Sequence, residues 1–94
     1  MIPPTVAIIG KRYEVRISEL DEDYGQCVSE QCLIEIRTSN QCHQQQADTL
    51  LHEVMHAIDH EMHCSMSEPQ IRRMATGLLA VLRDNPALVG FLTV

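Results

Sequence analysis

The sequence has very few aromatic residues and few cations. Its 94 residues contain no tryptophan, two tyrosines and one phenylalanine, and seven lysines and arginines stand against thirteen aspartates and glutamates. The resulting formal net charge of -6 argues against a nucleic-acid partner, because such a protein needs a basic surface to neutralise phosphates. The shortage of aromatic side chains also argues against a platform on which bases stack. We therefore expect no nucleic-acid partner.

Long hydrophobic runs and a secretory leader are also lacking. No stretch approaches the roughly 20 apolar residues of a membrane span, and Pro3 and Pro4 lie where a basic leader would begin. The apolar run Val6–Ile9 is too short for the core of a signal peptide. These absences predict a cytoplasmic protein with no membrane partner.

The cysteines lack the spacing of a structural zinc motif. Cys27, Cys32, Cys42 and Cys64 form no C-x-x-C pair, which argues against a zinc ribbon or knuckle. In a reducing compartment four cysteines are expected to be free thiols. Two disulfide bridges are the less favoured alternative. Cys27 and Cys32 are expected to pack in or beside a sheet as small apolar groups.

The first half of the chain has the pattern of β-strands. Four strands are expected between about residues 5 and 37, at 6–9, 12–17, 26–29 and 32–37. Gly10 and Lys11 separate the first two and suit a tight hairpin turn. Tyr13, Val15 and Ile17 alternate with polar neighbours, which predicts that one face of the second strand is buried.

The second half has the pattern of helices, at about 43–63 and 67–84. The first is expected to bury apolar residues that recur at helical spacing: Ala47, Leu51, Val54, Met55, Ile58 and Met62. Ser67 is expected to cap the second helix, with Gln70 completing a capping box. The expected apolar stripe of that helix consists of Ile71, Met74, Ala75, Leu78, Leu79 and Leu82. A last helical turn is expected within 88–92.

Strands that precede helices predict an α+β fold. We expect a small antiparallel sheet of about four strands followed by two or three helices, which together form a single domain over residues 1–94.

Histidine is over-represented, and its spacing points to a metal. Four of the five histidines lie between positions 52 and 63, and residues 52–56 match H-E-x-x-H. In a helix, His52 and His56 differ by about 40° and one turn, so their imidazoles can bind one ion. Zinc accepts neutral imidazole and leaves a position open for water. Glu53 is then placed to act as the general base that takes a proton from that water. The bland alternative is a pair of exposed histidines without a metal.

A catalytic zinc needs a third protein ligand. Glu68 is the preferred candidate, because it begins the second helix near the inward edge of the apolar stripe, where an unpaired acid is costly. His60 and His63 are the alternatives, and Cys64 is a distant one. A carboxylate that merely favours the helix N-terminus from solvent would explain Glu68 without a metal. Asp59 is considered as a carboxylate that orients a ligand histidine.

The acid-rich surroundings support a cation site. No lysine or arginine occurs from Thr38 to Ile71, whereas five acidic residues do, and this balance favours a bound dication. A solvated acidic helix face would explain most of these acids equally well. Tyr13 and Tyr24 are candidates for stabilising an oxyanion, and the sequence does not select between them.

The motif and the segment that follows it resemble those of a known family. Residues 50–58, with Leu50-Leu-His-Glu-Val-Met-His-Ala-Ile58, and residues 68–75 are similar to the HExxH and E-x-x-A-x-x-F-A segments of small zincin-like metallopeptidases of the ImmA/IrrE type, which are found in phages and prophages. The resemblance implies a zincin-like fold, with His52, His56 and Glu68 as zinc ligands and Glu53 as catalytic base. Ile71 and Met74 depart from the small and aromatic residues of that segment.

The sequence therefore predicts a zinc-dependent peptidase whose substrate is a protein or peptide that adds to the sheet edge as an extended strand. The alternative is a non-catalytic, metal-binding effector of phage type that binds a host protein.

Overall fold

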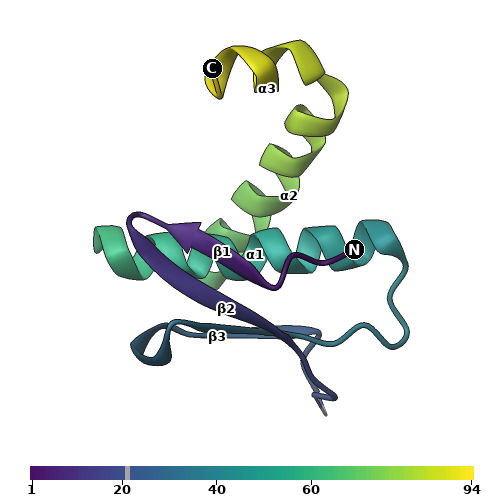
Figure 1. The fold of residues 1–94 in the computed structure, drawn as a ribbon, viewed down its shortest axis with the longest axis vertical. Helices are drawn as coiled ribbons and strands as arrows, with labels where there is room; N and C mark the ends of the chain where they lie inside the picture. Colours follow the sequence, from purple (N-terminus) through teal and green to yellow (C-terminus); the bar gives the residue numbers. More distant parts are fainter. Residues whose placement is uncertain (21) are drawn as a thin grey trace.

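The structure, a computed structural model, describes residues 1–20 and 22–94. Within these residues four strands precede the helices, as Figure 1 shows. The elements in chain order are β1 (Thr5–Ile8), β2 (Lys11–Ile17), β3 (Gly25–Val28), the 3-10 helix η1 (Ser29–Gln31), β4 (Leu33–Ile36), α1 (His43–Met62), α2 (Glu68–Asp84) and α3 (Pro86–Leu92). The expected α+β fold, with strands first and helices second, is confirmed.

The expectation of a purely antiparallel sheet is wrong. The strand order is β1-β2-β4-β3; β1 with β2 and β3 with β4 are antiparallel, but β2 and β4 run parallel. The physical reason is that β3 runs antiparallel to β2 but does not pair with it, and leaves a gap one strand wide between the two. The short turn of η1 then brings β4 back into the gap, where it must follow the direction of β2.

The hairpin between β1 and β2 turns one residue earlier than expected. Ile9 and Gly10 both have positive φ angles, 48° and 80°, which is the requirement of a type I′ turn. Lys11 belongs to β2 and pairs with Ile8. Ile9 therefore occupies a left-handed position and is 56% exposed at the hairpin tip.

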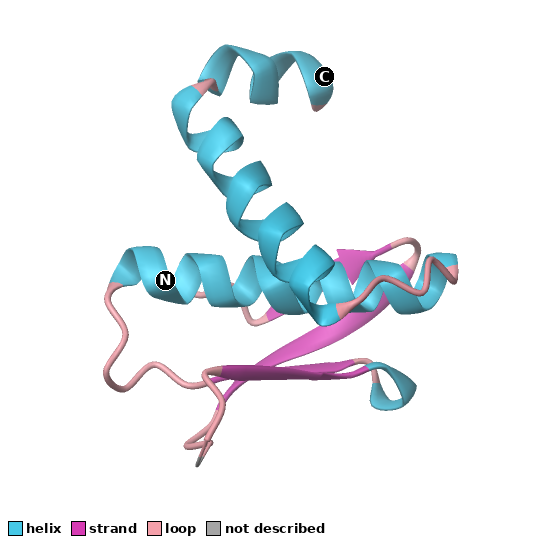
Figure 2. Cartoon of the chain, turned by 180° about the vertical axis from the view of Figure 1, so that it is seen from behind, coloured by secondary structure: helices cyan, strands magenta, loops and turns pink. Residues whose placement is uncertain are grey.

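The core lies between the sheet and α1, which crosses one face of the sheet (Figure 2). Its buried cluster consists of Ile8, Tyr13, Val15, Ile34, Ile36 and Ala57. Cys27 and Cys32 are half-buried against this cluster, as expected, and all four cysteines are free. Ile17 was expected to share the buried face of β2 but is 61% exposed, because it lies at the end of the strand.

The buried side of α1 also differs from the expected one. Its two buried residues are Glu53 and Ala57, and Leu50, Val54 and Ile58 pack half-buried against the core. Met62 was expected to lie in the core stripe but is 57% exposed. The helix is thus rotated so that an acidic residue, Glu53, faces the sheet.

A tight connection joins α1 to α2. His63 and Ser65 have positive φ angles, and the Asp59 carboxylate accepts a hydrogen bond from the backbone N–H of Met66 at 2.8 Å. Ser67 then caps α2, and Gln70 completes the capping box, as the sequence predicts. This connection fixes where α2 starts relative to α1.

From that start α2 rises away from the sheet, and α3 bends over at its far end (Figure 1). The buried residues of α2 are Ile71 and Ala75, while Met74 and Leu78 of the expected stripe are exposed. The final helical segment is longer than expected, because α3 begins at Pro86. No helix within residues 1–20 and 22–94 combines the length and apolar content needed to cross a membrane.

Candidate metal centre

His52 and His56 present their imidazoles on the same side of α1. Their Nε2 atoms are 3.2 Å apart, and their ring centroids are 4.9 Å apart. Both side chains are largely covered, with exposed fractions of 18% and 31%. Residues four apart in a helix are one turn apart on one face, so the spacing of the motif itself brings the two nitrogens together.

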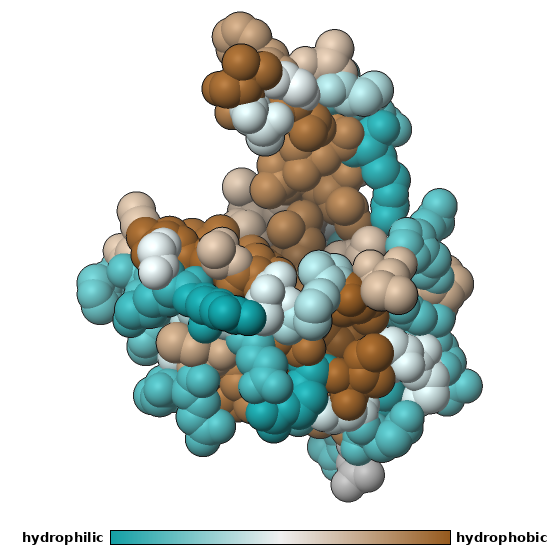
Figure 3. Space-filling view, in the orientation of Figure 1, coloured by the Kyte–Doolittle hydropathy of each residue, from teal (hydrophilic) through white to brown (hydrophobic). Residues whose placement is uncertain are grey.

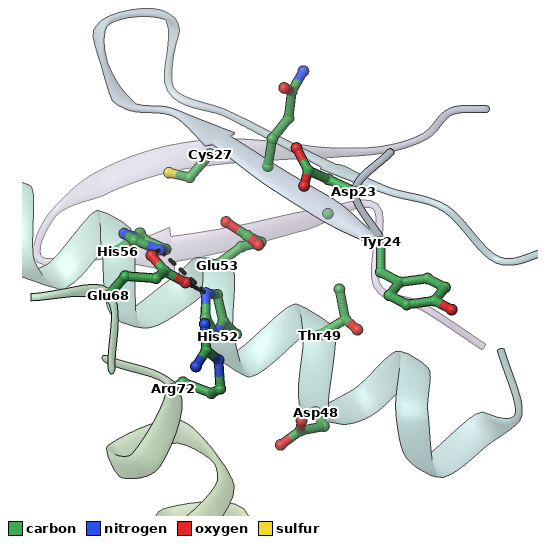
Figure 4. Close-up of a pocket in the computed structure, with 12 residues that line it drawn as sticks. Asp23, Tyr24, Cys27, Asp48, Thr49, His52, Glu53, His56, Glu68 and Arg72 are labelled. Carbon is green, nitrogen blue, oxygen red and sulfur yellow. Dashed lines mark hydrogen bonds and ion pairs between the residues drawn. The ribbon is translucent and has the colours of Figure 1, made fainter. Parts of the chain in front are cut away.

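Glu68 reaches this pair from the first turn of α2. One carboxylate oxygen lies 2.6 Å from His52 Nε2, and the other lies 2.8 Å from His56 Nε2. Figure 4 shows the carboxylate between the two rings. The structure thus brings together His52, His56 and Glu68, the three residues that the sequence singles out as metal ligands.

The donor set fits a small divalent cation. Two imidazole nitrogens and one carboxylate are the ligands typical of catalytic zinc sites, and tetrahedral ligands about 2.0–2.1 Å from zinc are about 3.3 Å from one another. The distance between the two histidine nitrogens, 3.2 Å, already matches. The shorter distances to Glu68 are those of an ion pair or a hydrogen bond, and a small outward movement of this half-exposed carboxylate would accommodate an ion.

Glu53 lies next to this group on the side of α1 that faces the sheet. It is only 6% exposed, and burial raises its pKa to about 7, with the neighbouring carboxylates of Glu68 and Asp23 adding to the effect. Loss of hydration disfavours the charged form of an acid, and nearby negative charge does the same. A carboxyl group with a pKa near neutrality can both accept and release a proton at physiological pH.

Gly25 is the reason that Glu53 can lie so close to β3. A Cβ atom at position 25 would be 2.8 Å from Thr49 Cγ2 and 3.2 Å from a carboxylate oxygen of Glu53. The first distance is shorter than carbon atoms tolerate, so with any other residue the Thr49 side chain or the backbone of one element would have to shift. Glycine therefore allows the close approach of β3 to α1 at this point.

An open cavity of about 620 Å³ lies in front of these residues. It is lined by residues from β3 and the segment before it, from α1 and from the start of α2: Asp23, Tyr24, Gly25, Gln26, Cys27, Asp48, Thr49, His52, Glu53, His56, Glu68 and Arg72. A second cavity of about 430 Å³ shares Tyr24, Asp48 and Thr49 with the first. The two cavities therefore adjoin, and we refer to them together as the groove, which follows α1 from Gln44 to His56.

One wall of this groove is the free edge of the sheet. The backbone C=O of Tyr24 accepts a hydrogen bond from the N–H of Arg37, and Gln26 pairs with Glu35 of β4. In an antiparallel pair, alternate residues direct their N–H and C=O groups away from the partner strand. The backbone groups of Gly25 and Cys27 therefore point to the open side, where an extended chain can hydrogen-bond to them.

The alternative histidine ligands, His60 and His63, do not join the group. His60 and His63 are exposed at the end of α1, and Cys64 is exposed after it. The metal-ligand group found within residues 1–20 and 22–94 consists of His52, His56 and Glu68. Among the described residues Asp59 makes no hydrogen bond to His52 or His56; its carboxylate accepts the backbone N–H of Met66 instead, so nothing here supports a role in orienting a ligand histidine. Asp59 instead shapes the connection that delivers Glu68.

The two tyrosines have different environments. Tyr13 is fully buried and its hydroxyl donates a hydrogen bond to Glu61, 3.2 Å away, so it lies away from the cavity. Tyr24 lines the cavity and its ring lies 4.4 Å from the guanidinium carbon of Arg37. Tyr13 is therefore ruled out as an oxyanion donor, and Tyr24 is retained as a candidate.

Arg72 is the cavity residue that sequence reasoning missed. It lies on α2, one turn after Glu68, and Figure 4 shows it beside His52. The signal available in the sequence was its position four residues after the proposed ligand, which places both side chains on one face of the helix. Arg72 brings a cation to a cavity that Asp23 and Asp48 also line.

Comparisons of the chain with protein families, with curated proteins and with solved structures found no match.

Proposed function

We propose that this protein is a zinc-dependent peptidase. The observation that carries the proposal is the convergence of His52, His56 and Glu68 beside a buried Glu53, all four at the wall of one open cavity. The resemblance of the two sequence segments to the ImmA/IrrE type of peptidase supports the same assignment.

His52, His56 and Glu68 would hold the zinc. When bound, zinc supplies a Lewis acid that polarises the scissile carbonyl and makes water a better nucleophile near neutral pH. All three side chains line the open cavity, and the half-exposed carboxylate of Glu68 leaves the cavity side of this group accessible to substrate.

Glu53 would carry the proton. As the water oxygen attacks the carbonyl carbon, the Glu53 carboxylate accepts a proton from the water. It then gives this proton to the amide nitrogen as the C–N bond breaks, so that the amine leaves neutral. Its raised pKa, about 7, suits a group that must perform both transfers.

The substrate would lie along β3. The outward-facing backbone groups of Gly25 and Cys27 can pair with an extended peptide, which brings a scissile bond over Glu53. Arg72 and Tyr24 are the cavity residues best able to donate a hydrogen bond to the developing oxyanion.

The decisive experiment compares the wild-type protein with Glu53→Gln. Zinc content is measured by mass spectrometry of the folded protein, and cleavage is measured on a peptide library by the appearance of new termini. We expect about one zinc per chain in both proteins and cleavage by the wild type alone. Cleavage that persists in Glu53→Gln, or a wild type that binds no zinc, would contradict the proposal.

A zinc-bound wild type that cleaves no library peptide would favour the non-catalytic, metal-binding alternative. The ligand set has its own test in Glu68→Gln, which keeps the size of the side chain but removes its charge. We expect clearly weaker zinc binding. Unchanged zinc affinity would point to His60 or His63 as the third ligand.

A further inference from the structure

Six apolar side chains of α2 and α3 are uncovered. Met74, Leu78 and Val81 follow one another at helical spacing on α2 and are 53%, 39% and 45% exposed. On α3, Leu88, Phe91 and Leu92 share one face and are 38%, 79% and 62% exposed. We refer to these six residues as the hook face. Figure 3 shows hydrophobic surface along both helices where they project from the body.

These two helices are poorly covered by their own chain. The buried residues of α2 are Ile71 and Ala75, both in its first half, and none of the seven residues of α3 is buried. Most helical stability in proteins comes from packing of the apolar face, and the second half of α2 and all of α3 bury no residue. The hook face therefore needs a covering surface.

The size of the hook face matches what a dimer interface requires. A fully exposed large apolar residue contributes about 150–200 Å², so the six exposed fractions amount to about 470–630 Å² of residue surface. Each partner in a standard interface buries about 800 Å², of which about 65% is apolar in homodimers. The largest apolar patch on a typical monomer is about 300–600 Å² and is often functional, so the hook face lies at the upper end of that range.

The charge distribution favours a second copy of the chain as the covering surface. Residues 68–94 contain Arg72, Arg73 and Arg83 against Glu68 and Asp84, so this part has a formal charge of about +1, whereas the whole chain has -6. Two copies that meet through this part keep apart residues 1–67 of each chain, which hold the acidic excess, including the four acids of α1. A shared two-fold axis would also pair the same surface with itself, as closed dimers do.

We propose that the hook face is the interface of a homodimer. In this dimer α2 and α3 of one chain pack on α2 and α3 of the other, and Phe91, the most exposed of the six side chains, becomes buried. The proposed zinc ligand Glu68 begins α2, ahead of this face, so dimerisation and metal binding can be tested separately.

The first test uses the unmodified full chain. Sedimentation velocity between 1 and 100 µM should show a dimer that dissociates on dilution, and the Tm should rise with protein concentration. A chain that is monomeric at 100 µM with a concentration-independent Tm would overturn the proposal. That result would overturn it even if the chain bound to phosphatidylglycerol vesicles or to another protein.

The second test uses matched variants. Phe91→Asp should weaken self-association at least ~30-fold, as expected for a central aromatic contact. Ile17→Asp is the control, because Ile17 is also a strongly exposed apolar residue (61%, against 79% for Phe91) but lies at the end of β2, and it should leave the dimer intact. Far-UV circular dichroism checks that both variants are folded. If Phe91→Asp fails to fold, the milder Leu78→Gln replaces it. A dimer that both Phe91→Asp and Leu78→Gln leave unchanged would overturn the proposal.

Discussion

The middle of α1 and its C-terminal part carry the same kinds of residues in different surroundings. One part holds His52, Glu53 and His56, and the other holds His60 and Glu61. Both glutamates contact or approach the sheet, but their pKa values shift in opposite directions. Burial raises the pKa of Glu53 to about 7, whereas hydrogen bonds from Lys11 and Tyr13 lower the pKa of Glu61.

The difference in pKa comes from the residues that face each of these two parts of α1. Glu61 is 3.0 Å from the ammonium of Lys11 and accepts the Tyr13 hydroxyl, so it ties the end of the helix to β2. Glu53 instead meets Gly25, which offers no charge, and it lies near two further carboxylates. Histidine and glutamate on a helix thus become an anchor or a candidate reactive site according to what the neighbouring strand presents.

The largest expected effect is a difference in zinc affinity between variants of the histidines in the two parts of α1. His56→Ala should lower zinc affinity by at least about 100-fold, because it removes a direct ligand, and even supporting residues cost about 10–100-fold. His60→Ala should change affinity by no more than about twofold. Competition with a zinc-binding chelator at pH 7.5 measures both. Equal losses of zinc affinity in the two variants would show that the middle and the C-terminal part of α1 do not differ in this way.

The pH dependence of stability should show the opposite shifts directly. The pKa of Glu53 is raised on folding, so its contribution to stability is present below pH 4.5 and is lost as the pH rises through about 7. In metal-free protein Glu53→Gln should therefore be more stable than the wild type at pH 8, by up to about 3 kcal/mol, and the difference should vanish near pH 4. Urea denaturation across this range measures it.

Glu61→Gln is the matched control for that prediction. The pKa of Glu61 is lowered on folding, so its contribution is present above pH 4.5 and is lost as the pH falls further. This variant should lose stability relative to the wild type at neutral pH and approach it in acid. If the stability of both variants relative to the wild type changed in the same direction with pH, the environments of Glu53 and Glu61 would not differ as described.

The close approach of β3 to α1 near Glu53 should be sensitive to a single methyl group at position 25. Gly25→Ala places a carbon 2.8 Å from Thr49 Cγ2, and we expect a loss of about 1–3 kcal/mol in the free energy of unfolding. Gly77→Ala on α2 meets no atom within 4 Å and should stabilise the chain by about 0.5–1 kcal/mol. Chemical denaturation compares them, and a neutral Gly25→Ala would argue against the tight contact.

The smallest effect concerns the connection between the helices. Asp59→Ala removes the acceptor for the Met66 N–H, which should cost about 1 kcal/mol of stability and, through the position of Glu68, less than about tenfold in zinc affinity. Asp48→Ala removes a different bond between α1 and α2, to Thr76. It should leave zinc affinity unchanged in the same chelator titration.

Local sequence patterns predicted the elements of the fold but not their partners. The alternation in β2 and the capping box at Ser67 and Gln70 depend on neighbours within a few residues, so they could be recognised in the sequence. The parallel pairing of β2 with β4 depends on where β3 returns, and an alternating strand pattern is the same for either direction. The exposed side of α2 was likewise unpredictable, because an apolar stripe does not specify what covers it.

The candidate site followed the same division. His52 and His56 are adjacent through helix geometry alone, and Glu68 was recognised because an acid near an apolar stripe needs a partner. The burial of Glu53 was missed, since the apolar stripe through Leu51 and Met55 suggested a different rotation of α1. Arg72 was missed because a single arginine on a helix carries no pattern until the cavity is known.

The free edge of β3 also sets a length scale for whatever binds there. The strand has four residues, and an extended chain covers about 3.3 Å per residue, so the contact spans about 13 Å. Only two of its residues direct their backbone groups outward. A segment that pairs with this edge must be free of its own secondary structure over that length. The few hydrogen bonds of so short a ladder cannot compensate for unfolding a structured segment. We therefore expect exposed loops and chain termini, rather than strands within a folded sheet, to be the segments that this groove accepts.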